Sequence, residues 1–154
     1  MIKSHWPGST HDSRIFKNSK IGAEFASGQR RGILLGDSGY RCEPWLLTPL
    51  LVPQTHAEVR YNKSHKHTRS SVERLFGRLK RRFHALHGEL RLQPKKVCRI
   101  VGACAVLHNL FIDFAEEEPP DLPPYDEGME VNPQFLGNEN GKVFRAQFIR
   151  ENFS

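Results

Sequence analysis

A helical pattern that begins at Thr55 is the sequence feature that most constrains the fold of this chain. Thr55 and Glu58 have the spacing of a capping box, in which each side chain accepts a hydrogen bond from the other residue's amide group. Beyond them, apolar side chains recur at the spacing of one helix face; they are Val72, Leu75, Phe76, Leu79, Phe83 and Leu86. We therefore predict one long helix over about residues 56–86.

Apolar runs on either side of this helix predict further elements. Residues 32–36 (GILLG) form an unbroken apolar run, which predicts a short strand buried on both faces. Pro94 suits a helix start, and residues 95–114 are apolar around most of the helical circumference, which predicts a second, well-buried helix. A helix is also expected up to about residue 27. Its cap would be one of three residues, Ser9, Thr10 or Asp12.

Charge divides the chain into two parts. Residues 1–114 have a net charge of +12, whereas residues 115–154 have a net charge of −6. The second part is rich in Pro, Glu, Asp, Asn and Gly, a composition typical of disorder. We therefore expect a folded domain over 1–114 and a largely disordered acidic tail over 115–154. Within the tail, residues 142–153 have the pattern of a short amphipathic helix.

The basic charge of residues 1–114 favours a polyanionic partner, of which nucleic acid is the commonest. The alternative is a solvated surface that keeps the chain soluble. A membrane partner is not expected, since the longest apolar run, residues 100–112, is 13 residues long and contains His108 and Asn109. Three cysteines without a CxxC pair are typical of reduced thiols inside a cell.

Asp37 stands where the predicted strand enters a turn. An aspartate in a turn is most often a turn former or a helix cap. The alternative is a metal ligand, because α/β sheets place their ligands at the carboxyl ends of central strands. Asp37 alone does not decide between these interpretations, and a second carboxylate is needed.

Glu73 is the candidate for that second carboxylate, with 35 residues between it and Asp37. On the predicted helix Glu73 lies at the edge between the apolar face and the polar face. Four basic side chains fall within about 50–80° of Glu73 around the helix axis, and we call them the basic stripe: Lys66, Arg69, Lys80 and Arg81. The alternative is an ordinary ion pair on the helix surface.

Five segments resemble, in order, the catalytic domain of PIF/Harbinger-type DDE transposases, and especially the Harbinger transposase-derived nucleases. They are WPGSTHDSRIF, LLGDSGY, LLTPL, RYNKSHKHTRSSVERLFGRLKRRF and ACAVLHN. The resemblance covers about residues 5–112, and the long helix block is its most specific part. It implies an α/β, RNase H-like (retroviral-integrase-like) fold.

The same resemblance implies a nuclease that acts on DNA phosphodiester bonds in the nucleus. Asp37 corresponds to the second and Glu73 to the third acid of a triad that holds Mg²⁺ or Mn²⁺, hard cations that prefer carboxylate oxygens. The basic stripe would contact DNA phosphates. Family transposases also work with a separate Myb/SANT-like DNA-binding protein, which is the partner expected here.

The first acid of the family has no counterpart in this chain. It lies upstream of the WPGSTHD block, whereas only ten residues precede His11 and none of them is Asp or Glu. Asp12 is interpreted as a helix cap. We therefore expect a partial fold that lacks the first strands and is dominated by long helices, with weak or no catalysis by the chain alone. The alternative is a non-catalytic DNA- or protein-binding module derived from a transposase.

The histidines form no recognisable zinc motif. His65 and His67 on the long helix, and His84 and His87 near its end, have no matching cysteine pair. Phosphate contact or plain exposure is therefore expected for these four. His108, in an apolar helix, is expected to be a hydrogen-bonded or packing histidine of the core.

Overall fold

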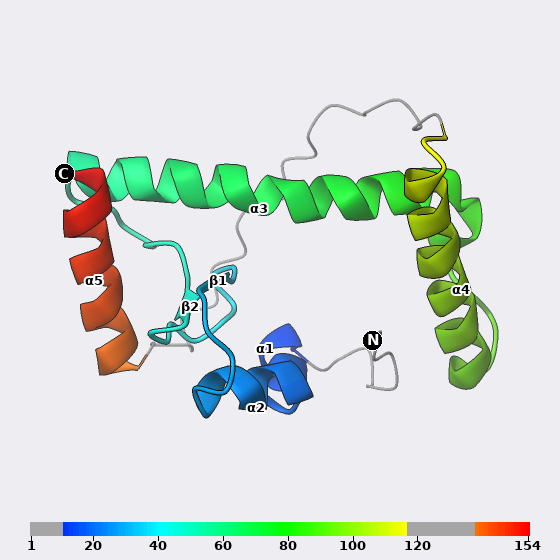
Figure 1. Ribbon diagram of the computed structural model, residues 1–154, viewed down its shortest axis with the longest axis horizontal. Coiled ribbons are helices and arrows are strands. Elements are labelled where there is room, and N and C mark those ends of the chain that lie inside the picture. Colours follow the sequence, from blue (N-terminus) through cyan, green and yellow to red (C-terminus); the bar gives the residue numbers. More distant parts are fainter. Residues whose placement is uncertain (1–10, 117–137) are drawn as a thin grey trace. The chain divides into compact units, whose positions relative to one another are not determined.

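A computed structural model describes residues 11–116 and 138–154 of the chain (Figure 1). Its elements are α1 (Asp12–Lys17), α2 (Lys20–Ala26), β1 (Leu34–Leu35), β2 (Leu46–Leu47), α3 (His56–Arg82), the 3₁₀ helix η1 (His84–Leu86), α4 (Pro94–Asp113) and α5 (Glu139–Phe153). The described residues divide into two compact units. The strand unit contains residues 11–69 and 138–154, and the helix unit contains residues 70–116.

A two-stranded parallel sheet lies at the centre of the strand unit. Leu34 pairs with Leu46 and Leu35 with Leu47. The Leu34 amide donates to the Trp45 carbonyl at 2.8 Å, and the Gly36 amide donates to the Leu47 carbonyl at 2.9 Å. The predicted strand is therefore present. The prediction that both of its faces are buried is wrong, because Leu34 and Leu35 point to opposite faces of the sheet and both are only partly buried.

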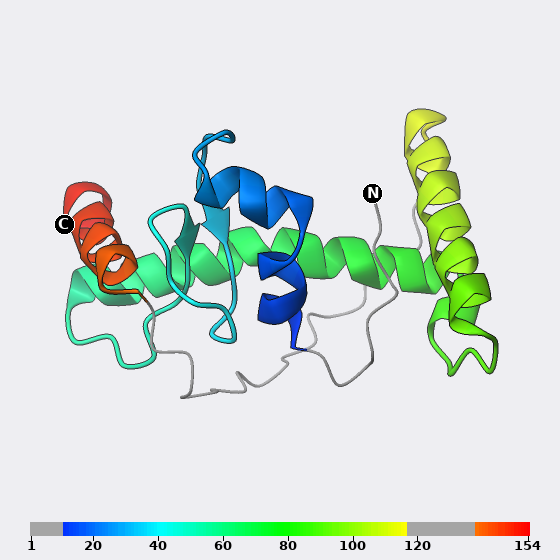
Figure 2. The same cartoon turned by 90° about the horizontal axis from the view of Figure 1, so that it is seen from below.

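Four buried residues form the core of the strand unit, namely Cys42, Leu47, Tyr61 and Ile149. Ile149 comes from α5, which lies beside the N-terminal end of α3 in both views (Figure 1, Figure 2). Phe153 of α5 packs edge-on against Tyr61 of α3, with 5.7 Å between the ring centroids. A helix is thus present at the end of the expected tail, and the expected disorder does not hold for residues 139–153. Phe144, Phe148 and Phe153 pack against this core, whereas Val143 is 64% exposed. Residues 117–137 of the expected tail lie outside the described residues.

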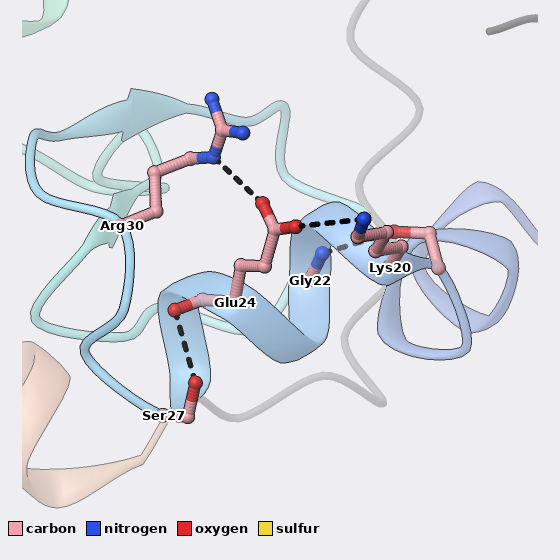
Figure 3. A network of polar contacts seen from close by, with 6 residues as sticks. Lys20, Gly22, Glu24, Ser27 and Arg30 are labelled. Carbon is pink, nitrogen blue, oxygen red and sulfur yellow. Dashed lines mark hydrogen bonds and ion pairs between the residues drawn. The ribbon is translucent and has the colours of Figure 1, made fainter.

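Two short helices replace the single helix expected up to residue 27. The chain turns after α1, and the Ser19 hydroxyl caps α2 by accepting a hydrogen bond from the Gly22 amide at 3.0 Å. Phe25 of α2 is buried and stacks on Trp45 beside β2. The loop after α2 is fixed by the Glu24 carboxylate, which accepts from Arg30 Nε at 2.9 Å and lies 3.7 Å from Lys20 Nζ (Figure 3).

The N-terminus of α3 confirms the predicted capping box. The Glu58 amide donates to Thr55 Oγ1 at 3.2 Å, and the Thr55 amide donates to Glu58 Oε2 at 3.0 Å. Hydrogen bonds from the Gln54 and Thr55 amides lower the pKa of Glu58. α3 ends at Arg82, four residues before the predicted end, because residues 84–86 form η1.

The helix unit consists of the C-terminal half of α3, η1 and α4. Phe83, just after α3, packs against Phe111 of α4 with 6.4 Å between the ring centroids. The prediction of a well-buried second helix is wrong, since Cys104 and His108 are the buried residues of α4. Several apolar side chains of α4 are exposed, among them Val106, Leu107, Leu110 and Ile112. In the described part of the helix unit, Phe111 of α4 contacts Phe83 and the guanidinium of Arg82 at the end of α3.

The described chain is helix-dominated with one small parallel sheet, consistent with the expected α/β class. None of its described helices combines the length and the apolar character that crossing a membrane requires.

Candidate functional site

The exit of β1 is held by two hydrogen bonds to one oxygen. The Leu47 carbonyl accepts from the Gly36 amide at 2.9 Å and from His65 Nε2 at 3.2 Å. Since a carbonyl oxygen can only accept, Nε2 carries the proton of the His65 ring. β1, β2 and α3 therefore meet at the Leu47 carbonyl, to which Gly36, the residue directly before Asp37, donates.

Asp37 uses its two carboxylate oxygens differently. Oδ1 accepts a hydrogen bond from the Gly39 amide at 2.8 Å, which closes an Asx turn. Oδ2 lies 3.8 Å from Nη2 of Arg69. The role of turn former thus accounts for Oδ1 alone, whereas Oδ2 faces the guanidinium group of Arg69. Both side chains are partly exposed, 45% for Asp37 and 32% for Arg69.

α3 reaches the sheet through side chains spaced four residues apart. The Tyr61 hydroxyl donates to the Thr48 carbonyl at 2.8 Å, His65 donates to Leu47, and Arg69 pairs with Asp37. Glu73 is the next position of this series along α3. It belongs to the helix unit, and its side chain is exposed. The structure therefore brings Asp37 together with Arg69, and the pairing of Asp37 with Glu73 stays a prediction.

Negative charge gathers around Tyr40, three residues after Asp37. Burial, with the added charges of Asp12 and Asp37, raises the pKa of the Tyr40 phenol to about 12, and Arg69 opposes this effect. Asp12 is the first residue of α1, whose N-cap is His11, so the prediction that Asp12 is the cap is wrong. The phenol and two carboxylates of α1 and the β1 turn thus share one electrostatic environment.

His65 is buried, with 4% of its surface exposed. The expectation that it contacts phosphate or solvent is therefore wrong, because its ring reaches inward to the Leu47 carbonyl. Its position four residues after Tyr61, on the same helix face, is the sequence signal that indicates this burial. Burial lowers the pKa of His65, against the opposing effect of the hydrogen bond to Leu47.

The lowered pKa of His65 predicts acid sensitivity of the strand unit. The unfolded chain binds a proton near the ordinary pKa of 6.5, whereas the folded chain binds it only at lower pH. The free energy of unfolding should therefore fall as the pH drops through 6.5 toward the folded pKa. Urea titrations at a series of pH values measure this loss. The loss should shrink in His65→Gln and persist in the matched variant His67→Gln; equal pH dependence in all three chains would contradict the assignment.

The basic stripe is not uniform in the structure. Lys66 and Lys80 are exposed, Arg69 pairs with Asp37, and Arg81 is half-buried. Sequence reasoning missed Arg82, whose guanidinium lies 4.4 Å from the centroid of the Phe111 ring. Contact of the stripe with DNA stays a prediction.

The candidate metal ligands around Asp37 are few, but carboxylate oxygens suit a hard cation. Among residues 11–116 and 138–154, no group of three or more His, Cys, Asp or Glu side chains could hold a metal. Asp37 nevertheless presents Oδ2 at a half-exposed position. Carboxylate oxygens match Mg²⁺ and Mn²⁺, and Mg²⁺ commonly keeps several waters while it is bound by one or two protein carboxylates. Asp37 therefore fits as one ligand of such an ion.

Two histidine expectations have different outcomes. His84 and His87 are exposed, with 5.6 Å between their ring centroids, which confirms their expected exposure. His108 is buried as expected, but neither of its ring nitrogens has a hydrogen-bond partner in the described part of the chain. His108 is therefore a packing histidine of α4.

Comparisons with known proteins identify similar sequences. The family model for the DDE superfamily endonuclease matches residues 1–109. "Putative nuclease HARBI1" of Mus musculus is 36% identical over 99% of this chain and 46% of that protein. The Homo sapiens protein of the same name is 36% identical over 82% of this chain and 39% of its own length. "Protein ALP1-like" of Arabidopsis thaliana is 29% identical over 77% of this chain and 33% of its own length.

The chain spans less than half the length of these curated relatives. No solved structure matches it. The matched residues 1–109 include Asp37, Glu73 and the whole basic stripe.

Proposed function

Because this chain belongs to the DDE superfamily endonuclease family and is related to Harbinger transposase-derived nucleases, we propose that it forms part of a nuclease that cleaves DNA phosphodiester bonds with a divalent metal. The observation that carries this proposal is the Asp37 carboxylate. It lies just beyond the carboxyl end of β1 and directs Oδ2 away from the turn that Oδ1 closes. An RNase H-like arrangement of the complete catalytic domain is part of the proposal.

Asp37 and Glu73 are the proposed ligands of Mg²⁺ or Mn²⁺. Ions held by these carboxylates would supply activation of the attacking water or 3′-hydroxyl group and stabilisation of the leaving oxygen. The protein's own contribution at Asp37 is positioning. His65 and Gly36 hold the Leu47 carbonyl, so the backbone directly before Asp37 is fixed by both the sheet and α3.

The basic stripe is proposed to hold the DNA backbone. Lys66 and Lys80 are exposed cations on α3, the geometry that phosphate contact requires. A Myb/SANT-like DNA-binding protein and a nuclear location belong to the same proposal, on the strength of the family resemblance. Catalysis by this chain alone is expected to be weak, because the described residues offer fewer than three clustered metal ligands.

A non-catalytic DNA-binding module is the second candidate. It is favoured by Asp37 itself, whose two oxygens already have protein partners in Gly39 and Arg69. In that case Asp37 would serve only the turn and the ion pair.

Parallel measurement of cleavage and DNA affinity separates the two candidates. With Mn²⁺ the wild-type chain should nick supercoiled plasmid slowly, and Asp37→Asn/Glu73→Gln should lose this activity while its DNA affinity stays within about threefold, because phosphate contacts supply most of that affinity. Lys80→Gln should weaken DNA binding and reduce its salt dependence by about one counterion. Nicking that continues unchanged in the double variant would overturn the proposed function.

A further inference from the structure

Arg69 occupies a position that the proposed function leaves unexplained. It is a member of the basic stripe, yet its Nη2 lies 3.8 Å from Oδ2 of Asp37, the oxygen proposed to bind the metal. A guanidinium group beside a metal ligand repels the incoming cation. Arg69 is thus proposed to contact a DNA phosphate, and it also pairs with the carboxylate that is proposed to bind the metal.

The backbone position of Arg69 on α3 is fixed by neighbouring contacts of the same helix face. Tyr61 and His65, the two preceding positions of the same helix face, are buried and hydrogen-bonded to Thr48 and Leu47. The contact of the guanidinium group with Asp37 is looser, because 3.8 Å exceeds the roughly 2.7–2.9 Å of a charge-assisted hydrogen bond. At 32% exposure, the Arg69 side chain is accessible to solvent from its position beside the carboxylate.

We propose that Arg69 exchanges between Asp37 and a DNA phosphate, and that this exchange couples metal binding to DNA binding. Without DNA, the guanidinium neutralises Asp37 and disfavours the metal. When a phosphate takes the guanidinium, Oδ2 loses its counter-ion and gains affinity for a divalent cation. Arginine suits this exchange, since its planar fork binds carboxylates and phosphates with the same geometry. The inference rests on the proposed function, with Asp37 as a metal ligand.

Thermodynamic linkage makes the coupling reciprocal. If DNA tightens metal binding by a given factor, the metal must tighten DNA binding by the same factor. A single positive charge about 6 Å from a divalent cation in water opposes its binding by about tenfold. The exchange of Arg69 would keep the occupancy of the metal site low until DNA is bound.

Opposite effects of one substitution test the exchange. Arg69→Gln should bind Mn²⁺ about tenfold more tightly than the wild-type chain in calorimetry without DNA, while its affinity for a short DNA duplex falls. Lys63→Gln removes the same charge from an exposed position elsewhere on α3 and should leave Mn²⁺ binding unchanged. Arg69→Lys keeps the charge and should stay near the wild-type Mn²⁺ affinity. Circular dichroism establishes that each variant is folded.

The coupling itself is measured as the duplex affinity with and without Mn²⁺ at matched ionic strength. Mn²⁺ should strengthen duplex binding by the wild-type chain, and this gain should largely disappear in Arg69→Gln. Unchanged or weaker Mn²⁺ binding by Arg69→Gln would overturn the exchange, as would equal tightening by Arg69→Lys. If Asp37→Asn still abolished Mn²⁺ binding, the proposed function would survive that failure; Mn²⁺ binding that is independent of Asp37 would overturn both.

Discussion

Gly141→Ala is expected to destabilise the strand unit by about 3 kcal/mol, the upper range for overpacking a close contact. A Cβ atom at position 141 would overlap the carbonyl group of Cys42 and the Cα of Glu43. These are backbone atoms that cannot rotate away. The first turn of α5 is fixed at the same place, since the Asn138 amide donates to the Cys42 carbonyl at 3.2 Å.

Displacement of α5 would also disturb the core, because α5 contributes the buried Ile149. Urea denaturation measures the loss, and hydrogen exchange of the α5 amides locates it. The matched control is Gly102→Ala on α4, where a Cβ meets no heavy atom within 4 Å. That change should be neutral or stabilising by up to about 1 kcal/mol, the ordinary effect of alanine in a helix. A Gly141→Ala chain as stable as the Gly102→Ala chain would contradict the packing of α5.

The sequence predicted those helices and strands whose position is set by residues close to one another in the chain. The start of α3 follows from Thr55 and Glu58, which need only each other and the nearest amides. The position of β1 follows from its apolar run. The pairing of Leu35 with Leu47 could not be predicted, because it joins strands across an irregular loop that contains Pro44 and is decided by tertiary packing.

Burial was the property that sequence reasoning misjudged most. His65 stands in the polar run SHKH, which predicts exposure, and its place four residues after Tyr61 is the one signal that indicates burial. Its partner, a backbone carbonyl 18 residues away, is set by tertiary packing. α4 shows the opposite error, because its apolar composition predicted burial whereas Val106, Leu107, Leu110 and Ile112 are exposed. Apolar side chains favour burial, but the packing of other elements against a helix decides whether its side chains are buried.

The place of Asp37 at the end of a strand was predicted from the sequence, whereas its contacts were not. Asp37 was selected by its place at a strand end, and it lies there in the structure. The ion pair with Arg69 was not predicted, since the family resemblance implied phosphate contact for the basic stripe and gave no reason to place one of its members beside Asp37.

Replacing both proposed metal ligands is expected to have the largest effect on function. Asp37→Asn and Glu73→Gln keep the size of each side chain and one acceptor oxygen, and they remove the negative charge that a hard cation prefers in its ligands. Because disturbing even an outer-shell partner costs about 10–100-fold in metal affinity, loss of a direct ligand should weaken Mn²⁺ binding by more than about 100-fold. In Asp37→Asn the side-chain amide oxygen can still accept a hydrogen bond from Gly39, so the turn should persist in the variant.

Calorimetric titration of Mn²⁺ into the wild-type chain, the two single variants and the double variant decides whether these two carboxylates form a metal site. We expect Mn²⁺ binding by the wild-type chain that is lost in each single variant, since both carboxylates would bind the same ion. Glu89→Gln, an exposed carboxylate between η1 and α4, serves as the charge-matched control and should bind Mn²⁺ as the wild-type chain does. Equal Mn²⁺ affinity in the wild-type chain and the double variant would contradict a metal site at Asp37 and Glu73.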